Sequence, residues 1–165
     1  VDDQDYLITA IFKLYPWEWI VAEEFGRHIV RRLDSALWIE PIWKMLWSNK
    51  AILPLLWELA PNHPNLLPAG WDSASVGRRH VAKPILAREG ANIVISEDGV
   101  ETGRSEGPYT SPLVYQALYD LPRFDDAYPV LGVWTVGGEA AGLGIREGGR
   151  ITGDEARFVP HIIEG

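Results

Sequence analysis

The sequence predicts an α+β fold, with helices in the first half of the chain and a mainly antiparallel sheet in the second. Apolar residues recur at helical spacing early in the 165-residue chain, whereas short apolar runs separated by turn residues fill its second half. Helices followed by strands, rather than the two in alternation, are typical of α+β folds. We therefore expect residues 1–69 to be mainly helical and residues 79–165 to be mainly β, with a small, polar loop between them.

The first half is expected to hold one long helix and three shorter elements. From Pro16 to Leu33, apolar side chains recur three or four positions apart, and acidic residues precede basic ones, which complements the helix dipole. A short buried strand is predicted over residues 37–39 and a short helix over residues 41–47. A further helix is predicted over residues 50–59, with Pro54 in its first turn.

Six strands are expected in the second half, each a short apolar run bounded by turn residues. Turn signals such as Glu97-Asp98-Gly99 and Gly137-Gly138 separate neighbouring runs. Strands joined by such short turns pair antiparallel. The predicted strands cover residues 80–84, 91–95, 113–118, 128–136, 140–145 and 158–163.

Composition limits the function classes to be considered. Hydrophobic residues make up 47% of the chain and the formal net charge is −8, so we expect a folded domain that does not bind nucleic acid, which requires a basic face. The lack of cysteine excludes disulfides, thiolate metal sites and cysteine nucleophiles. No apolar run approaches the roughly 20 residues of a membrane helix, and the acidic start is unlike a secretion signal. We therefore expect no membrane association and a cytoplasmic location. The acidic charge suits a cationic co-substrate such as a polyamine, or serves solubility alone.

Two lysines and a glycine-containing loop are candidates for a phosphate site. Lys50 precedes a predicted helix and Lys83 ends a predicted strand, and lysine offers a mobile positive charge to a phosphate. The loop over residues 88–92 can present backbone N–H groups and an arginine to an anion. Each feature also has an ordinary interpretation, as surface lysines and a turn between strands.

Two strand ends carry further candidates. Residues 115–122 leave a predicted strand and could meet an adenine with a backbone edge and an apolar wall, or simply form a core strand. Arg146 follows a strand interrupted by glycines, which allow a ligand to approach closely. It could stabilise charge on a phosphoryl group, or pair with Glu147 or Glu139 on the surface. The four histidines form no ligand pair, so no metal ligand is assigned.

Eight segments stand in the same order as in one known family: Phe12–Glu18, Glu40–Trp43, Asn49–Trp57, Pro61–His63, Val81–Ile85, Tyr115–Leu118, Thr135–Gly138 and Ile145–Arg146. Through them the chain resembles glutathionylspermidine synthase and its relatives over essentially its whole length. The resemblance implies an ATP-grasp fold and a ligase, dependent on ATP and Mg²⁺, that activates a carboxylate as an acyl phosphate and joins it to an amine. Its partners would be ATP, a small-molecule or peptide carboxylate, and an amine.

The resemblance also implies roles for individual residues. Lys50 and Lys83 look like the two lysines that bind the nucleotide phosphates. Arg88-Glu89-Gly90 looks like the flexible loop that closes over the phosphates, and Arg88 would be catalytic. Arg146 looks like the catalytic arginine that steadies the transferring phosphate and the tetrahedral adduct. The adenine-binding hinge and further nucleotide contacts would be formed by Gln116, Ala117, Leu118, Tyr119, Val130 and Ile151.

The chain departs from this family in three ways. The family's metal-binding carboxylates and most of its acid-substrate site would lie upstream of Val1, so we expect this fragment alone to bind nucleotide poorly and to be inactive. The loop over residues 87–92 differs in composition from that of the established synthase and looks closer to an uncharacterised acid–amine ligase branch, so glutathione and spermidine are only the family's named substrates. Bifunctional members carry an amidase with a cysteine nucleophile, and this chain has no cysteine.

A non-catalytic ATP-grasp-like module, kept for binding or assembly, is the alternative. Joint retention of four cationic residues favours the enzyme, because a module without catalysis has little reason to hold Lys50, Lys83, Arg88 and Arg146. An arginine and carboxylates in the metal-binding pattern upstream would support the enzyme, and their absence would support the module.

Overall fold

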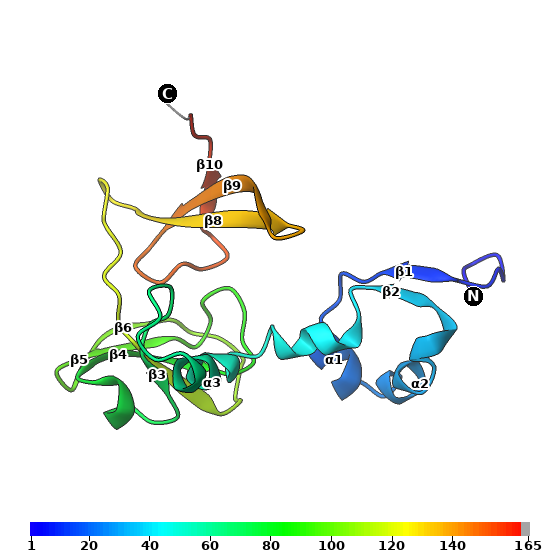
Figure 1. Ribbon diagram of the computed structural model, residues 1–165, viewed down its shortest axis with the longest axis horizontal. Coiled ribbons are helices and arrows are strands. Elements are labelled where there is room, and N and C mark those ends of the chain that lie inside the picture. Colours follow the sequence, from blue (N-terminus) through cyan, green and yellow to red (C-terminus); the bar gives the residue numbers. More distant parts are fainter. Residues whose placement is uncertain (163–165) are drawn as a thin grey trace. The chain divides into compact units, whose positions relative to one another are not determined.

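A computed structural model describes residues 1–162 and shows a mixed α and β chain with few helices and mainly antiparallel sheets. The chain forms two compact units, Val1–Asn49 and Lys50–Gly165, which can be followed by colour in Figure 1. The sequence predicted a division by secondary structure, into a mainly helical part, 1–69, and a mainly β part, 79–165. The compact units instead separate at Lys50, so the helix that follows this lysine belongs with the strands.

The first unit combines short helices with a two-stranded sheet. Its strands run parallel, with Ala10 opposite Leu37 and Phe12 opposite Ile39. Two parallel strands require a crossover connection, and the helices between them provide it. The elements are β1 (Ala10–Phe12), α1 (Trp17–Ala22), α2 (Gly26–Val30), the 3-10 helix η1 (Leu33–Ser35), β2 (Leu37–Ile39) and the 3-10 helix η2 (Ile42–Leu46).

Trp17 forms the centre of this unit. Its side chain is 1% exposed, and its ring centroid lies 5.0 Å from that of Trp38, which is on β2. The Trp17 Nε1–H donates to the Glu40 carbonyl oxygen at 3.2 Å, so the buried indole keeps a hydrogen-bond partner. The Lys13 ammonium lies 5.3 Å from the Trp17 ring centroid. Trp17 thus joins α1 to β2 and to the segment that follows it.

The single helix expected from Pro16 to Leu33 was wrong, because the structure breaks it into α1 and α2. Glu23 ends α1 in an extended conformation, with ψ 158°. Gly26 then comes so close to α1 that a Cβ would lie 1.9 Å from the Ile20 carbonyl oxygen, an approach that requires glycine. The apolar spacing led to the prediction of one helix because α1 and α2 pack against each other. Each of them therefore needs an apolar side, and the two sides together look like one continuous helical pattern.

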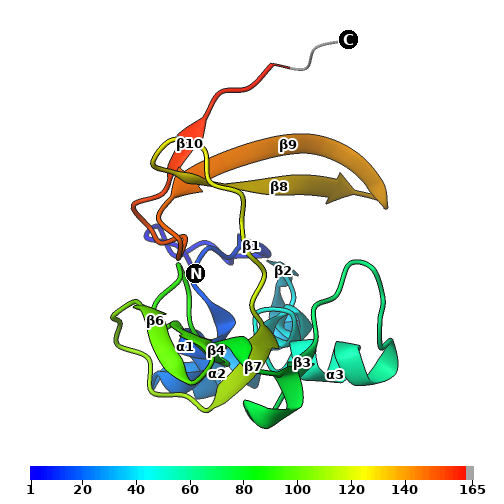
Figure 2. The same cartoon turned by 90° about the vertical axis from the view of Figure 1, so that its left-hand side faces the viewer.

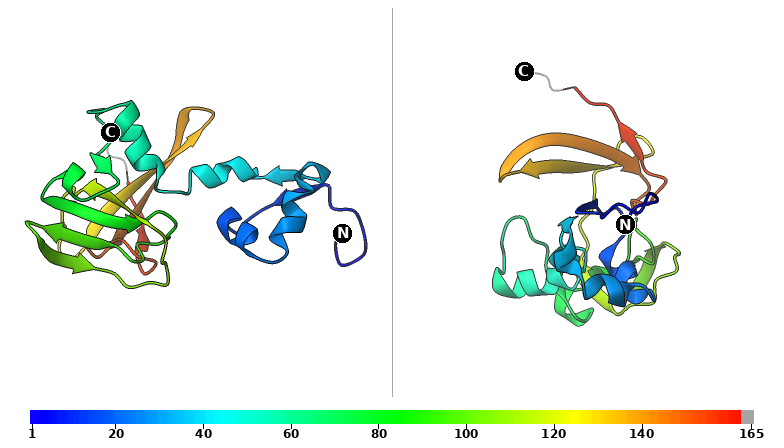
Figure 3. Two further views of the ribbon diagram at one scale, coloured as in Figure 1. Left: turned by 90° about the horizontal axis from the view of Figure 1, so that it is seen from below. Right: turned by 90° about the vertical axis from the view of Figure 1, so that its right-hand side faces the viewer.

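Two antiparallel sheets build the second unit, and Figures 1 and 2 both show the smaller sheet lying over the larger one. The larger sheet has the strand order β3-β7-β4-β5-β6, and the smaller sheet has the order β10-β9-β8. Helix α3 packs against β3 and β7, as Figure 3 shows. The elements are α3 (Ile52–Leu59), β3 (Ala69–Gly70), the 3-10 helix η3 (Ala74–Val76), β4 (Arg79–Pro84), β5 (Val94–Glu97), β6 (Val100–Arg104), β7 (Leu113–Ala117), β8 (Tyr128–Val136), β9 (Glu139–Gly148) and β10 (Arg157–Val159).

The core of the second unit lies on the central strands of the larger sheet. Val114 on β7 is 0% exposed, Ile95 on β5 is 3% exposed, and Ala82 on β4 is 8% exposed. Pro54, in the first turn of α3, is also fully buried. These strands and α3 therefore form the rigid base on which any site of this unit rests.

All six strands expected in the second half are present, and β8 has the expected bounds. β5 starts at Val94, later than expected, because residues 88–92 form a loop with positive φ at Glu89 and Asn92. Of the last predicted strand, 158–163, residues 158 and 159 lie in β10, residues 160–162 are not strand, and Ile163 lies outside the described residues. The sequence did not predict β1, β3 and β6.

Replacing Trp17 by alanine is expected to lower the free energy of unfolding of the first unit by about 3–5 kcal/mol, since a large buried side chain is lost. Urea unfolding followed by circular dichroism measures this change. The matched control is Trp47→Ala, because Trp47 is 67% exposed and its loss should cost less than about 1 kcal/mol. Equal costs for the two variants would contradict the assignment of Trp17 as the centre of the unit.

Candidate functional site

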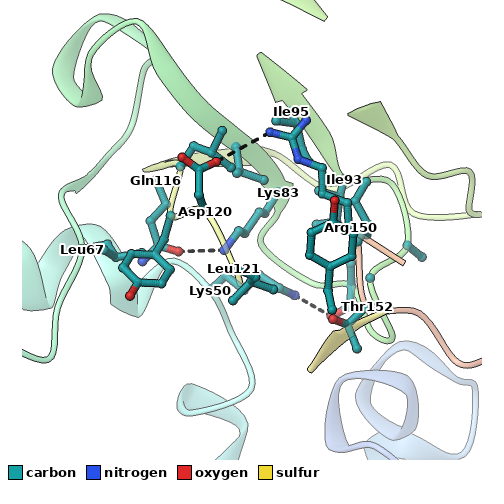
Figure 4. A pocket seen from close by; sticks show the side chains of 18 of the residues that line it. Lys50, Leu67, Lys83, Ile93, Ile95, Gln116, Asp120, Leu121, Arg150 and Thr152 are labelled. Carbon is teal, nitrogen blue, oxygen red and sulfur yellow. Dashed lines mark hydrogen bonds and ion pairs between the residues drawn. The ribbon is translucent and has the colours of Figure 1, made fainter. Parts of the chain in front are cut away.

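A pocket of about 580 Å³ opens in the second unit, on the larger sheet. That volume lies within the range of ordinary small-molecule sites. Figure 4 shows Gln116 and Leu67 on one side of the pocket and Arg150 and Thr152 on the opposite side, with the two lysines between them. The pocket therefore lies between the larger sheet and the segment that connects β9 with β10.

Lys50 and Lys83 form a cationic end of this pocket. The Lys50 backbone N–H donates to the Ile85 carbonyl oxygen at 2.8 Å, and its Nζ donates to the Ala87 carbonyl oxygen at 2.5 Å. The Nζ of Lys83 donates to the Gln116 Oε1 at 2.7 Å. Burial, and the positive charge of Lys50, lower the pKa of Lys83. An anion placed between the two ammonium groups would oppose both effects, because its negative charge favours the protonated form.

The loop that joins β4 to β5 borders the cationic end of the pocket. Hydrogen bonds to the segment 105–109 fix this loop at Gly90 and Asn92. The Asn92 Nδ2 donates to the Gly107 carbonyl oxygen at 2.9 Å, and its Oδ1 accepts from the Tyr109 N–H at 2.8 Å. The Ser105 hydroxyl donates to the Gly90 carbonyl oxygen. Gly90 has φ 69°, which favours glycine. The loop thus presents Arg88 and Glu89 at the pocket from a fixed base.

The segment that leaves β7 forms another wall. The Ala117 N–H donates to the Pro68 carbonyl oxygen at 2.8 Å, and the Leu118 N–H donates to the Arg79 carbonyl oxygen at 3.0 Å. Gln116, Ala117, Leu118 and Tyr119 all line the pocket, and Tyr119 is 63% exposed. These bonds hold the segment against its neighbours while its outer edge faces the pocket mouth.

Arg150 borders the pocket on the opposite side and belongs to an ion network. Its Nη2 donates to Glu97 Oε1 at 2.6 Å and lies 3.9 Å from Asp120 Oδ1. Arg79 contacts the same two carboxylates, at 2.9 Å for Glu97 and 2.8 Å for Asp120. Hydrogen bonds from Arg150, Thr102 and Arg79 lower the pKa of Glu97 from 4.5 to about 2. The network's stabilisation is thus present above pH 4.5 and lost as the pH falls through about 2.

Ten of the twelve candidate residues come together in this pocket: Lys50, Lys83, Arg88, Glu89, Gly90, Gln116, Ala117, Leu118, Tyr119 and Ile151. Arg146 and Val130 do not line it. They are cross-strand partners on β9 and β8. Because side chains two positions apart share a sheet face, both lie on the same face of the smaller sheet as the pocket residue Tyr128.

Sequence reasoning missed several residues of the pocket. Arg150 and Thr152 flank the candidate Ile151 and follow the Gly148-Gly149 turn signal, which was the available sign of their place, whereas Asp120 was considered only as part of the segment 115–122. The apolar floor, formed by Val81, Ile93 and Ile95, was predicted only as strand. Within residues 1–162, the structure shows no group of three or more histidine or acidic residues that could hold a metal ion, and no helix long and apolar enough to cross a membrane.

Replacing Lys50 by methionine is expected to raise the pKa of Lys83, because a like charge that disfavours the protonated form is removed. Lysines labelled with ¹³C-methyl groups report each pKa by NMR. Lys44→Met, which removes an exposed lysine of the first unit, is the control and should leave Lys83 unchanged. An unchanged pKa in the Lys50 variant would mean that the two charges do not interact.

Gly90→Ala is expected to cost more stability than Gly99→Ala, although both positions have positive φ. A Cβ on Gly90 would lie 2.5 Å from the Thr152 carbonyl oxygen, whereas nothing lies within 4 Å at Gly99. Each variant should lose about 1–2 kcal/mol for its backbone conformation, and only Gly90→Ala should lose more. Urea unfolding compares them, and equal losses would show that the loop does not contact the Thr152 segment.

Comparison with known proteins finds one family model and several relatives that are named as ligases or synthetases. The sequence model of the family described as "Glutathionylspermidine synthase preATP-grasp" matches residues 1–164. A Haemophilus influenzae protein named "Putative acid--amine ligase" is 44% identical, over 98% of this chain and 43% of its own length. Trypanothione synthetase from Crithidia fasciculata is 30% identical, over 89% of this chain and 26% of its own length.

A bifunctional glutathionylspermidine synthetase/amidase from Escherichia coli is 29% identical, over 96% of this chain and 29% of its own length. The chain therefore spans less than half the length of these relatives. The resemblance drawn from the eight ordered segments is confirmed, since the family match covers almost every residue. The chain belongs to the glutathionylspermidine synthase preATP-grasp family.

Proposed function

We propose that this chain is the ATP-binding portion of an ATP-dependent carboxylate–amine ligase with an ATP-grasp fold. The observation that carries the proposal is the pocket, which brings Lys50, Lys83 and the segment 116–119 together from distant parts of the sequence. Relatives named as synthetases and ligases support the reaction class. In that reaction a carboxylate oxygen attacks the γ-phosphorus of ATP and ADP leaves. An amine then attacks the acyl carbon and phosphate leaves.

The cationic end would bind the phosphates. Lys50 and Lys83 line the pocket together, and Arg88, on the β4–β5 loop, lines it as well. Phosphoryl transfer depends on positioning and charge neutralisation more than on covalent help, and these cations supply both. Because burial and Lys50 lower the pKa of Lys83, an arriving polyanion would raise that pKa again and favour the protonated ammonium. Glu89 and Gly90 would place the loop over the phosphates.

The apolar floor of the pocket would hold the base. Val81 and Ile95 on the larger sheet and Ile151 opposite them offer apolar surfaces for the two faces of a planar ring. The N–H groups of Ala117 and Leu118 are already used within the protein. A base at the hinge would therefore take its hydrogen-bond donor from Tyr119 and its acceptors from carbonyl oxygens of the hinge.

The residues that the structure describes do not fit a magnesium site, since no cluster of three ligands occurs among residues 1–162. Magnesium stays a prediction from the family resemblance, with its ligands expected upstream of Val1.

The acid and the amine are proposed by class. The Escherichia coli relative is named for glutathionylspermidine, a conjugate of a peptide with a polyamine. A net charge of −8 would favour a cationic amine such as a polyamine. Arg146, with Val130 beside it, would act where the phosphate is transferred, on the part of the sheet face beyond Tyr128. A cytoplasmic location belongs to the same proposal.

One observation favours a second candidate function, a non-catalytic module for binding or assembly. Arg146, the proposed catalytic arginine, does not line the pocket that holds the lysines. A module that binds nucleotide without transferring phosphate would need the lysines and the hinge but not Arg146.

Lys83→Ala is expected to weaken Mg²⁺–ATP binding at least about 10-fold, because one charged contact to phosphate is lost. Calorimetric titration of the 165-residue chain, and of the same chain extended upstream, measures the dissociation constant. Lys44→Ala is the control and should leave the affinity within about 2-fold. Lack of binding in both unmodified folded chains would contradict the proposed function.

Arg146→Ala is expected to lower turnover while leaving ATP affinity nearly unchanged, because its contact would form only as phosphate is transferred. Phosphate release from the upstream-extended chain, supplied with glutathione and spermidine as trial substrates, measures turnover. Turnover that is unaffected by the substitution would remove Arg146 from the mechanism, and ATP binding without turnover on a broader set of acids and amines would favour the module.

A further inference from the structure

The segment Arg150–Thr152 forms a wall of the pocket although it belongs to the connection between β9 and β10. Figure 4 shows Arg150 and Thr152 facing Gln116 across the pocket. The strand that follows the segment, β10, pairs with β9 in the smaller sheet and not with the larger one. The position of this wall relative to the larger sheet therefore depends on contacts made by the segment itself.

Arg150 supplies the strongest of these contacts. Its Nη2 donates to Glu97 Oε1 at 2.6 Å, and its Nη1 donates to Thr102 Oγ1 at 3.3 Å. Glu97 is on β5 and Thr102 is on β6. The guanidinium thus fastens the segment to the outer hairpin of the larger sheet.

Glu97 is itself held in place for this contact. Arg79 donates to Glu97 Oε2 through Nε at 3.0 Å and Nη2 at 2.9 Å, and it also reaches both oxygens of Asp120 at 2.8 Å. Two cations therefore alternate with two anions around one edge of the pocket. Such a network, in which one arginine contacts two carboxylates, is better ordered than a single exposed pair.

The far end of the segment touches the phosphate-side loop. A Cβ on Gly90 would lie 2.5 Å from the Thr152 carbonyl oxygen and 3.1 Å from the Ile151 Cγ2. Arg150 at one end and Thr152 at the other thus connect the β5–β6 hairpin to the loop that carries Arg88. Movement of Arg150 would therefore displace two walls of the pocket together, the segment Arg150–Thr152 and the loop that carries Arg88.

We propose that Arg150 is a positioning residue, which through Glu97 holds Ile151 and Thr152 over the pocket and thereby sets nucleotide affinity. The proposal rests on the proposed function for the identity of the ligand as a nucleotide. In this proposal the guanidinium acts on the pocket wall, because its Nη1 and Nη2 donate to Thr102 and Glu97 of the protein. Holding the wall therefore needs the two separate Nη donors of an arginine, and the single ammonium of a lysine would not replace them.

The first test needs no nucleotide. In Arg150→Met, amides of residues 151–153 and 89–91 should exchange hydrogen at least about 10-fold faster, while exchange in β4 and β7 stays unchanged. Arg157→Met is the matched control, because Arg157 contacts Glu147 at 3.5 Å on the same sheet outside the pocket. Unchanged exchange in Arg150→Met would overturn the proposal.

The second test measures Mg²⁺–ATP affinity in whichever chain binds, the 165-residue chain or its upstream extension. Arg150→Met and Glu97→Gln should each raise the dissociation constant about 10-fold, and the double variant should lose little more, because both break one contact. Arg150→Lys should behave like Arg150→Met, whereas a direct phosphate contact would be rescued by lysine. Such a rescue, or additive losses, would overturn the positioning role.

The two tests separate this inference from the proposed function. Faster exchange in Arg150→Met, together with no ATP binding by any unmodified chain, would overturn the proposed function and the nucleotide part of the inference, and would keep Arg150 as the residue that holds the wall. Tight ATP binding that is unaffected by Arg150→Met would support the proposed function and overturn the inference.

Discussion

The second unit depends on one electrostatic constraint, the approach of Lys50 and Lys83 within a half-buried space. The chain bends two separate segments so that these like charges meet: one precedes α3 and the other ends β4. Lys83 has an amide oxygen as its partner at 2.7 Å, and its pKa is lowered by burial and by Lys50. Such an arrangement is costly unless an anion completes it, which is why it identifies a site better than any single residue does.

The rest of the pocket serves this cationic end by rigid connections. The β4–β5 loop is anchored by Asn92, and the segment after β7 is anchored through the N–H groups of Ala117 and Leu118. The third wall, around Ile151, is fastened by Arg150. Each wall is thus an end or a loop of a strand whose interior is buried, as in many sites carried by rigid scaffolds.

Most strands of the second unit could be predicted from the sequence, because each is determined by residues close to it along the chain. Strands bounded by turn residues, such as Asp98-Gly99 with φ 52° and 84°, are fixed by nearby residues. β6 was missed because its residues are polar and mostly exposed, and the helix from Pro16 was overextended because the Gly26 contact is tertiary. Ten candidates named from the family resemblance line one pocket in the structure, whereas the ion pairs of Arg150 and Asp120 could not be predicted, since they join segments far apart in sequence.

The central claim is that the phosphates of a nucleotide lie between Lys50 and Lys83 and that its base lies at residues 116–119. Chemical-shift mapping of the isotopically labelled chain with Mg²⁺–ATP tests it most directly, in the upstream-extended form if affinity requires it. The account predicts the largest shifts at the two lysine side chains, at amides 88–91 and 117–121, and at Ile151. Shifts confined to the β8–β9 hairpin beyond Val130, or to the first unit, would contradict it.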